Sequence, residues 1–120
     1  MTLDQFEKVV SDVVSKLPKN FKDKLDNVQI ISKAWPSEYD LASIQARRQT
    51  LLFGLYTGVP KIKRGSNYST LPDKITIFAG PILYSSSTLK DAKKLIKSTV
   101  LHEIGHHFGM NEAEISKAFL

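Results

Sequence analysis

Cysteine is absent from this chain of 120 residues, which excludes both disulfide bonds and thiolate metal ligands. Any metal site must therefore use histidine and carboxylate side chains. No apolar run reaches the roughly 18 residues that a membrane-spanning helix needs, so we expect no membrane span. The first residues include two acids and no basic start. A secretion signal is therefore not expected, and the predicted location is the cytoplasm.

Arginine is also scarce, because only 3 of the 17 basic residues are arginines. The net charge is +5, and the lysines are spread along the sequence from Lys8 to Lys117. The nearest approach to a cluster is Lys61, Lys63 and Arg64. This pattern is typical of a lysine-rich solvated surface, so we do not expect a nucleic-acid partner.

Hydrophobic spacing predicts the first half of the fold. Apolar residues recur at steps of three and four from Leu3 to Leu17, which predicts a helix ended by Pro18. A short helical turn is expected around Phe21. Short apolar or alternating runs predict strands at Val28–Ser32, Leu51–Tyr56 and Lys74–Ala79, with Gly80-Pro81 ending the last one. Residues 61–73 are expected to form a loop, and residues 36–50 receive no assignment.

A long helix is predicted near the C-terminus. Thr88 can cap its start, Asp91 lies in its first turn, and apolar periodicity continues to Gly109. A last short helix is expected over residues 111–119. The order of helix, strands and helices indicates an α+β fold with a small mixed sheet, and we predict a single domain over residues 1–120.

The predicted long helix contains His102, Glu103 and His106. Residues four apart stand on one face of a helix, so the two imidazoles can reach one metal ion. Glu103 is rotated away from that pair and can hold and deprotonate a water molecule without being a ligand itself. The H-E-x-x-H spacing therefore predicts a zinc site with Glu103 as the general base.

Catalytic zinc usually has three protein ligands, and Glu112 is the favoured third one. The motif continues through Gly109 to Glu112, which resembles the metzincin pattern H-E-x-x-H-x-x-G-x-x-H with a carboxylate in the last place. Gly109 can adopt a left-handed conformation and turn the chain back. Glu114, His107, and an upstream or absent ligand remain alternatives.

Several segments resemble a family of small, single-domain, zincin-like metallopeptidases. The similarity is carried by Leu52–Pro60, Leu71–Ile82 and Thr99–Met110, and more weakly by Pro18–Val28. It extends over most of residues 18–116 but not over 34–50. The resemblance implies a minimal zincin-like fold in which a few-stranded sheet packs on the metal-binding helix. It also implies zinc at His102 and His106, with Glu103 as the catalytic acid/base.

The function predicted from these observations is zinc-dependent hydrolysis of a peptide or protein substrate. An extended peptide can pair with the strand at residues 74–80 if that strand is a sheet edge. Tyr56, Tyr68 and Tyr84 are candidate donors to an oxyanion, although such tyrosines are more often core residues. A zinc-dependent nuclease or RNA-processing factor and a non-catalytic zinc-binding interaction module are the alternatives. Substrate identity and oligomeric state stay open.

Overall fold

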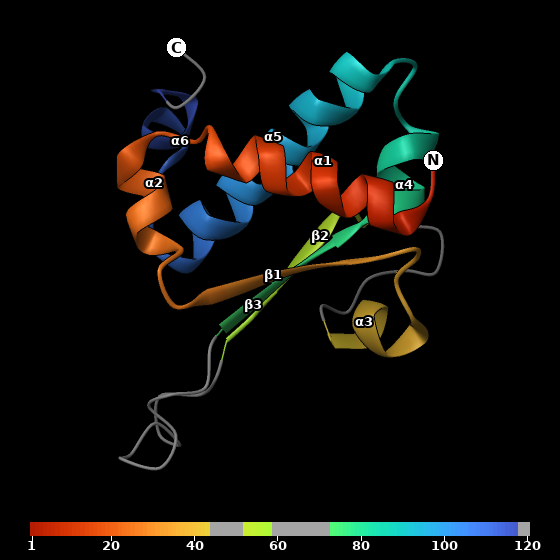
Figure 1. Ribbon diagram of the computed structural model, residues 1–120. Coiled ribbons are helices and arrows are strands. Elements are labelled where there is room, and N and C mark those ends of the chain that lie inside the picture. The colour runs from red at the N-terminus through yellow and green to blue at the C-terminus, as the bar shows by residue number, and fades with distance from the viewer. Residues whose placement is uncertain (44–51, 59–72, 118–120) are drawn as a thin grey trace.

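The computed structural model describes residues 1–43, 52–58 and 73–117 of the chain (Figure 1). Helices and strands follow one another in the order α1 (Leu3–Ser15), α2 (Lys19–Lys24), β1 (Val28–Lys33), α3 (Glu38–Ser43), β2 (Gly54–Thr57), β3 (Asp73–Phe78), α4 (Ala79–Tyr84), α5 (Leu89–His107) and α6 (Glu112–Lys117). The α+β class and the small mixed sheet are confirmed.

The sheet contains three strands in the order β1-β3-β2. β1 runs parallel to β3, with Val28 opposite Asp73, whereas β2 runs antiparallel to β3, with Gly54 opposite Ile77. β3 is thus paired on both sides, and nearly all of its side chains are buried. The condition for peptide pairing at residues 74–80, that this strand is a sheet edge, is therefore not met, because β3 is central and the edges of the described sheet are β1 and β2.

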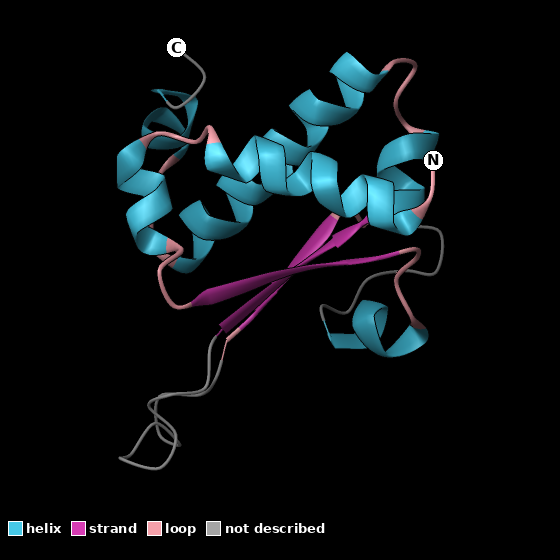
Figure 2. Cartoon of the chain, in the orientation of Figure 1, coloured by secondary structure: helices cyan, strands magenta, loops and turns pink. Residues whose placement is uncertain are grey.

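Two long helices cover one face of the sheet, as Figures 1 and 2 show. α1 begins at a capping box, in which the Gln5 amide donates to the Thr2 hydroxyl (3.1 Å) and the Thr2 amide donates to the Gln5 side chain (2.8 Å). α1 and α5 pack on each other and on the sheet. Their facing residues form the core, which includes Phe6, Val10, Ile75, Ile77, Ile96, Val100 and Ile104.

Several boundaries differ from the sequence-based expectations. β3 ends at Phe78 rather than at Ala79, and Gly80 and Pro81 lie in the first turn of α4, where a proline removes no helical hydrogen bond. β2 begins at Gly54 rather than at residue 51, and α3 occupies part of the segment that received no assignment. Most of the expected loop at residues 61–73 lies outside the described residues, and Asp73 belongs to β3.

Candidate metal centre

The helix that carries the predicted site is fixed at its start as the sequence indicates. The Asp91 amide donates to the Thr88 hydroxyl (3.1 Å), and the Ala92 amide donates to the Thr88 carbonyl (3.0 Å). Thr88 is therefore the N-cap of α5. The helix then continues without interruption to His107, so His102, Glu103 and His106 lie within one helix as predicted.

His102 is half-buried and has a defined orientation. Its Nδ1 atom lies 2.8 Å from the Ser98 carbonyl oxygen and 3.4 Å from the Ser98 hydroxyl. A carbonyl oxygen can only accept a hydrogen bond, so Nδ1 carries the proton in this contact. In the neutral imidazole with this tautomer, Nε2 is the nitrogen that has the lone pair. A histidine that ligates a metal commonly has its second ring nitrogen held in this way, and His102 therefore fits a zinc ligand.

Glu103 lines an open groove together with His102. The groove has a volume of about 390 Å³ and lies between α5 and the start of β2, and its walls are Leu52, Phe53, Gly54, Leu95, Ser98, Thr99, His102 and Glu103. Gly54 allows the strand to approach the helix this closely. A Cβ atom there would lie only 2.5 Å from the Thr99 methyl carbon. The proposed general base thus faces a space that can accept an extended ligand.

The end of α5 turns the chain back toward the helix. Gly109 has a φ of 71°, as predicted, and the Met110 amide donates to the Gly105 carbonyl (2.7 Å) in the manner of a Schellman motif. α6 then packs against α5 at Gly105, where a Cβ atom would lie 2.5 Å from Ile115 Cδ1. The two glycines therefore bring the start of α6, where Glu112 stands, close to the motif helix.

Glu114 has another role in the structure. The Glu114 amide donates to the Asn111 side chain (2.8 Å), and the Asn111 amide donates to the Glu114 carboxylate (3.3 Å). This reciprocal pair is a capping box at the start of α6. The carboxylate of Glu114 is thus used to hold the helix, which favours Glu112 over Glu114 as the third ligand.

His107 lies against the sheet. Its ring stacks on Tyr56, with ring centroids 3.8 Å apart and planes inclined by 14°, and its Nε2 atom is 3.7 Å from Asp73 Oδ2. The His107 side chain is nevertheless 38% exposed to solvent. The contact with β2 and β3 was not predicted, because no local pattern in the sequence connects these three residues.

The three tyrosines that were candidate oxyanion donors lie in different surroundings. The Tyr56 hydroxyl donates to Asp73 (2.9 Å), and Tyr84 is exposed at the end of α4. Tyr68 lies outside the described residues. Met110, which follows Gly109 in the motif segment, is partly buried against the core.

The convergence of the complete ligand set remains a prediction. The side chains of His106 and Glu112 are outside the part of the chain that the structure describes, although their backbones are placed in α5 and α6. Among the described side chains, no group of three or more histidines and carboxylates could hold a metal ion. The chemistry of the donors fits zinc, because imidazole and carboxylate are both accepted ligands.

Lysines gather at one place that we did not anticipate. Lys16, Lys93, Lys94 and Lys97 line a groove of about 250 Å³ between α1 and α5, together with Asp12 and Val13. Asp12 lies 3.3 Å from Lys16 and 3.8 Å from Lys93. The helical spacing of the α5 lysines was the signal for this cluster. The groove faces α1, whereas His102 and Glu103 line the groove that faces β2. The expected cluster at residues 61–64 lies outside the described residues.

A small mixed sheet packed on a helix that carries H-E-x-x-H defines a minimal zincin-like protein. Residues 25–118 match the sequence model of the Zincin-like metallopeptidase family, and the chain belongs to this family.

Among solved structures, the chain resembles a conserved hypothetical protein from Thermus thermophilus. The TM-score is 0.59 at 22% sequence identity, with 90% of this chain and 94% of that chain covered. At this identity the likeness concerns the fold alone. No curated protein matches the chain.

Proposed function

We propose that this chain is a zinc-dependent peptidase in which His102, His106 and Glu112 hold the metal and Glu103 is the general base. The observation that carries the proposal is the orientation of His102, whose Nδ1 atom is engaged by the Ser98 carbonyl so that Nε2 can bind a metal. Family membership supports a zinc-dependent hydrolase. The identity of the ligands, the peptide substrate and the cytoplasmic location are our inferences from the sequence.

Bound zinc would supply a Lewis acid that polarises a carbonyl group and lowers the pKa of water. The carboxylate of Glu103, next to His102 in the same groove, accepts the proton of the attacking water. It then delivers that proton to the departing amine as the peptide bond breaks. In this scheme the three ligands, His102, His106 and Glu112, do not move protons, and they would hold the metal in one position.

The outer edge of β2 is a suitable place for an extended substrate. β2 is paired with β3 on one side only among the described strands, and its first residue, Gly54, borders the groove that contains Glu103. A peptide that adds to this edge would form main-chain hydrogen bonds with β2 and pass over Glu103. The apolar walls formed by Leu52, Phe53 and Leu95 favour substrates with hydrophobic side chains at the neighbouring positions.

A nuclease is less well supported, because the basic residues do not surround the candidate site. The described lysine cluster faces α1, on the other side of α5 from His102, and the described residues that line its groove include no aromatic side chain for base stacking. No described helix is both long and apolar enough to span a membrane. A non-catalytic zinc-binding module fits the same geometry, and turnover measurements distinguish it from a peptidase.

The proposal is tested by metal analysis of protein prepared without added zinc. Wild type and Glu103→Ala are expected to contain one zinc ion per chain, whereas His106→Ala is expected to lose it. Glu112→Gln should bind zinc less well, and Glu114→Gln is the matched control that should keep it. One zinc ion per chain in His106→Ala would contradict the proposed site. If Glu114→Gln loses zinc and Glu112→Gln keeps it, Glu114 rather than Glu112 is the third ligand.

The same proteins are then incubated with an unfolded protein and with RNA. We expect wild type to cleave the unfolded protein and Glu103→Ala to lose this activity while it retains the metal. Cleavage of RNA would support the nuclease instead. A zinc-loaded wild type that cleaves neither substrate would support the non-catalytic module.

A further inference from the structure

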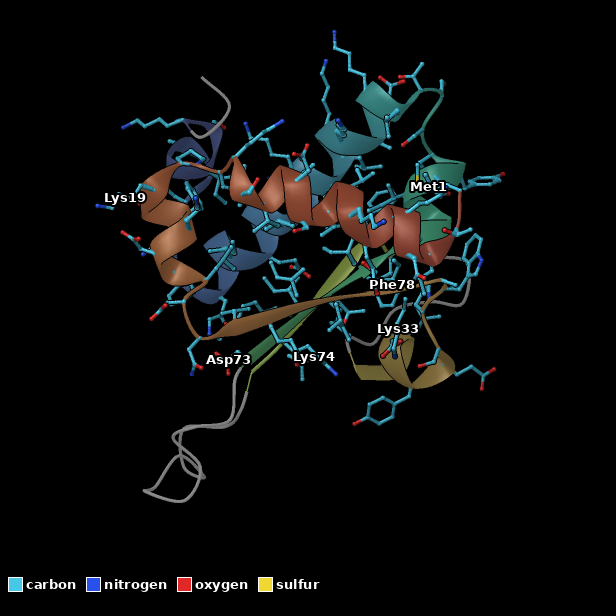
Figure 3. The ribbon with its side chains drawn as sticks, viewed as in Figure 1. Met1, Lys19, Lys33, Asp73, Lys74 and Phe78 are labelled. Atoms are coloured by element: carbon cyan, nitrogen blue, oxygen red, sulfur yellow. The ribbon has the colours of Figure 1, made fainter. Side chains whose placement is uncertain are left out.

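Three residues from separate elements meet at one end of the sheet, and we call them the Asp73 junction: Tyr56 on β2, Asp73 on β3 and His107 at the end of α5. Tyr56 donates its hydroxyl hydrogen to Asp73 Oδ2 (2.9 Å), and His107 Nε2 lies 3.7 Å from the same oxygen. The His107 ring stacks on the Tyr56 ring. Figure 3 shows Asp73 at the opposite end of β3 from Phe78.

The junction is built around a buried carboxylate, and the His107 side chain, which is 38% exposed, lies against it from the outside. Asp73 is only 7% exposed, so its carboxylate needs polar partners within the protein. Gly58, which directly follows β2, approaches the His107 ring so closely that a Cβ atom there would lie 3.3 Å from Cε1. Phe108 adds an edge contact to the His107 ring, with centroids 5.1 Å apart. These contacts hold the histidine ring in one place relative to the sheet.

The position of His107 gives these contacts a consequence for the metal centre. His107 is the last residue of α5, directly after His106 and two residues before the turn at Gly109. Successive residues of a helix are rotated by about 100°. Fixing the ring of His107 against β2 therefore fixes the rotation of the last turn, and with it the backbone of His106 and the start of the turn to Glu112.

We propose that the Asp73 junction is a positioning device for the zinc site. It docks the last turn of α5 on the β2–β3 pair, and it keeps the second of two consecutive histidines on the sheet, where it does not compete with His106 for the metal. The inference rests on the proposed function, because it assigns these residues a task toward zinc. Tyr56, Asp73 and His107 are positioning residues in it, and none of them is a ligand.

Zinc affinity, measured by competition with a chromophoric chelator, tests this inference. We expect Asp73→Ala and His107→Ala to bind zinc about 10- to 100-fold more weakly than wild type, which is the usual effect of removing a group that orients metal ligands. Tyr56→Phe keeps the ring stack but loses the hydroxyl, and it should weaken binding less than either alanine variant. It also serves if Asp73→Ala fails to fold.

The matched control is Asp40→Ala. Asp40 is an aspartate of nearly equal burial, 8% exposed, which caps α3 and is hydrogen-bonded to Lys33 and to the Ser37 amide. If the junction has a purely structural role, every variant that is destabilised to the same extent should lose zinc affinity to the same extent. A positioning role predicts that Asp40→Ala keeps zinc affinity within about twofold of wild type, whereas Asp73→Ala does not. The unfolding midpoint of each metal-free variant is measured in parallel.

Two outcomes overturn the inference in distinguishable ways. If wild type binds zinc and all three junction variants bind it equally well, the positioning role is wrong and the proposed function stands. If wild type binds no zinc at all, the proposed function is wrong and the inference falls with it. Weaker zinc binding in the junction variants, with Asp40→Ala unchanged, supports both.

Discussion

Asp40 and Asp73 are buried to nearly the same extent, yet they lie in regions that are organised very differently. Asp40 sits at the corner between β1 and α3, where it accepts from the Ser37 amide (2.9 Å) and from Lys33 (3.3 Å), three and seven residues away in the sequence. Asp73 accepts from Tyr56, which is 17 residues away, and lies beside His107 at the far end of α5.

The contrast shows that a buried aspartate can stabilise either one local turn or the contact between several elements of the fold. The Asp40 corner is a capping box, because the Asp40 amide also donates to the Ser37 hydroxyl (3.0 Å). It can form as soon as α3 forms. The Asp73 junction exists only when the strands are paired in register and α5 is docked on them. Changes at the junction should therefore affect the whole fold, whereas changes at the corner should stay local.

The largest expected effect is on stability when each aspartate is replaced by alanine. Asp73→Ala leaves the half-buried Tyr56 hydroxyl without this acceptor and removes the carboxylate that lies beside His107, and we expect a loss of about 2 kcal/mol in the free energy of unfolding. Asp40→Ala removes one half of a helix cap, and we expect a loss of about 1 kcal/mol. Urea unfolding of the metal-free proteins, followed by circular dichroism, measures both.

The metal-free condition matters in this experiment, because bound zinc would add its own stabilisation to the folded state. If Asp73→Ala and Asp40→Ala lose the same free energy of unfolding, the sequence separation of the contacts that an aspartate makes does not determine its contribution to stability. A larger loss for Asp40→Ala would show that the corner at α3 contributes more to the fold than the junction does.

Removal of a tyrosine hydroxyl in either of these two regions should change the free energy of unfolding less than removal of the aspartate. Tyr56→Phe removes the hydrogen bond to Asp73 while it keeps the stacked ring, and we expect a loss of about 1 kcal/mol. Tyr39 in α3 is 82% exposed, so Tyr39→Phe is the matched control and should change stability by less than about 0.5 kcal/mol. Thermal unfolding of the metal-free variants gives the difference, and an unchanged midpoint for Tyr56→Phe would mean that water replaces the lost hydroxyl.

The same contrast explains how much of the fold could be predicted from the sequence. α1, β1 and α5 were predicted because apolar spacing and capping residues such as Thr88 are local signals. α3 was missed although the Ser37-x-x-Asp40 spacing is a local capping pattern, so the signal was present. The Asp73 junction could not be predicted, because it depends on the antiparallel register of β2 with β3.

The features of the candidate site can also be separated into those that local sequence signals predict and those that they do not. The helical placement of His102 and Glu103 and the positive φ of Gly109 follow from spacing and from the freedom of glycine, and both are observed. The orientation of His102 by the Ser98 carbonyl was not predicted, although the i−4 position was the place to look. The close packing of Ile115 on Gly105, which brings α6 to the motif, is a long-range contact that the sequence alone does not indicate.

The smallest expected effect concerns the pH dependence of the Asp40 corner. Burial raises the pKa of Asp40, but hydrogen bonds from the Ser37 amide and from Lys33, with the charge of Lys33, together lower it more, so that the pKa lies below its ordinary value of 3.8. A carboxylate with a lowered pKa in the folded state stabilises the fold above pH 3.8, and this contribution is lost as the pH falls below that value.

We expect wild type to be more stable than Asp40→Asn at neutral pH, and the difference should shrink on acidification below pH 3.8. Urea unfolding of the two proteins over a pH series measures this difference. If it stays constant through that range, the ionised carboxylate contributes nothing beyond what the neutral amide supplies, and the corner is held by the geometry of its hydrogen bonds alone.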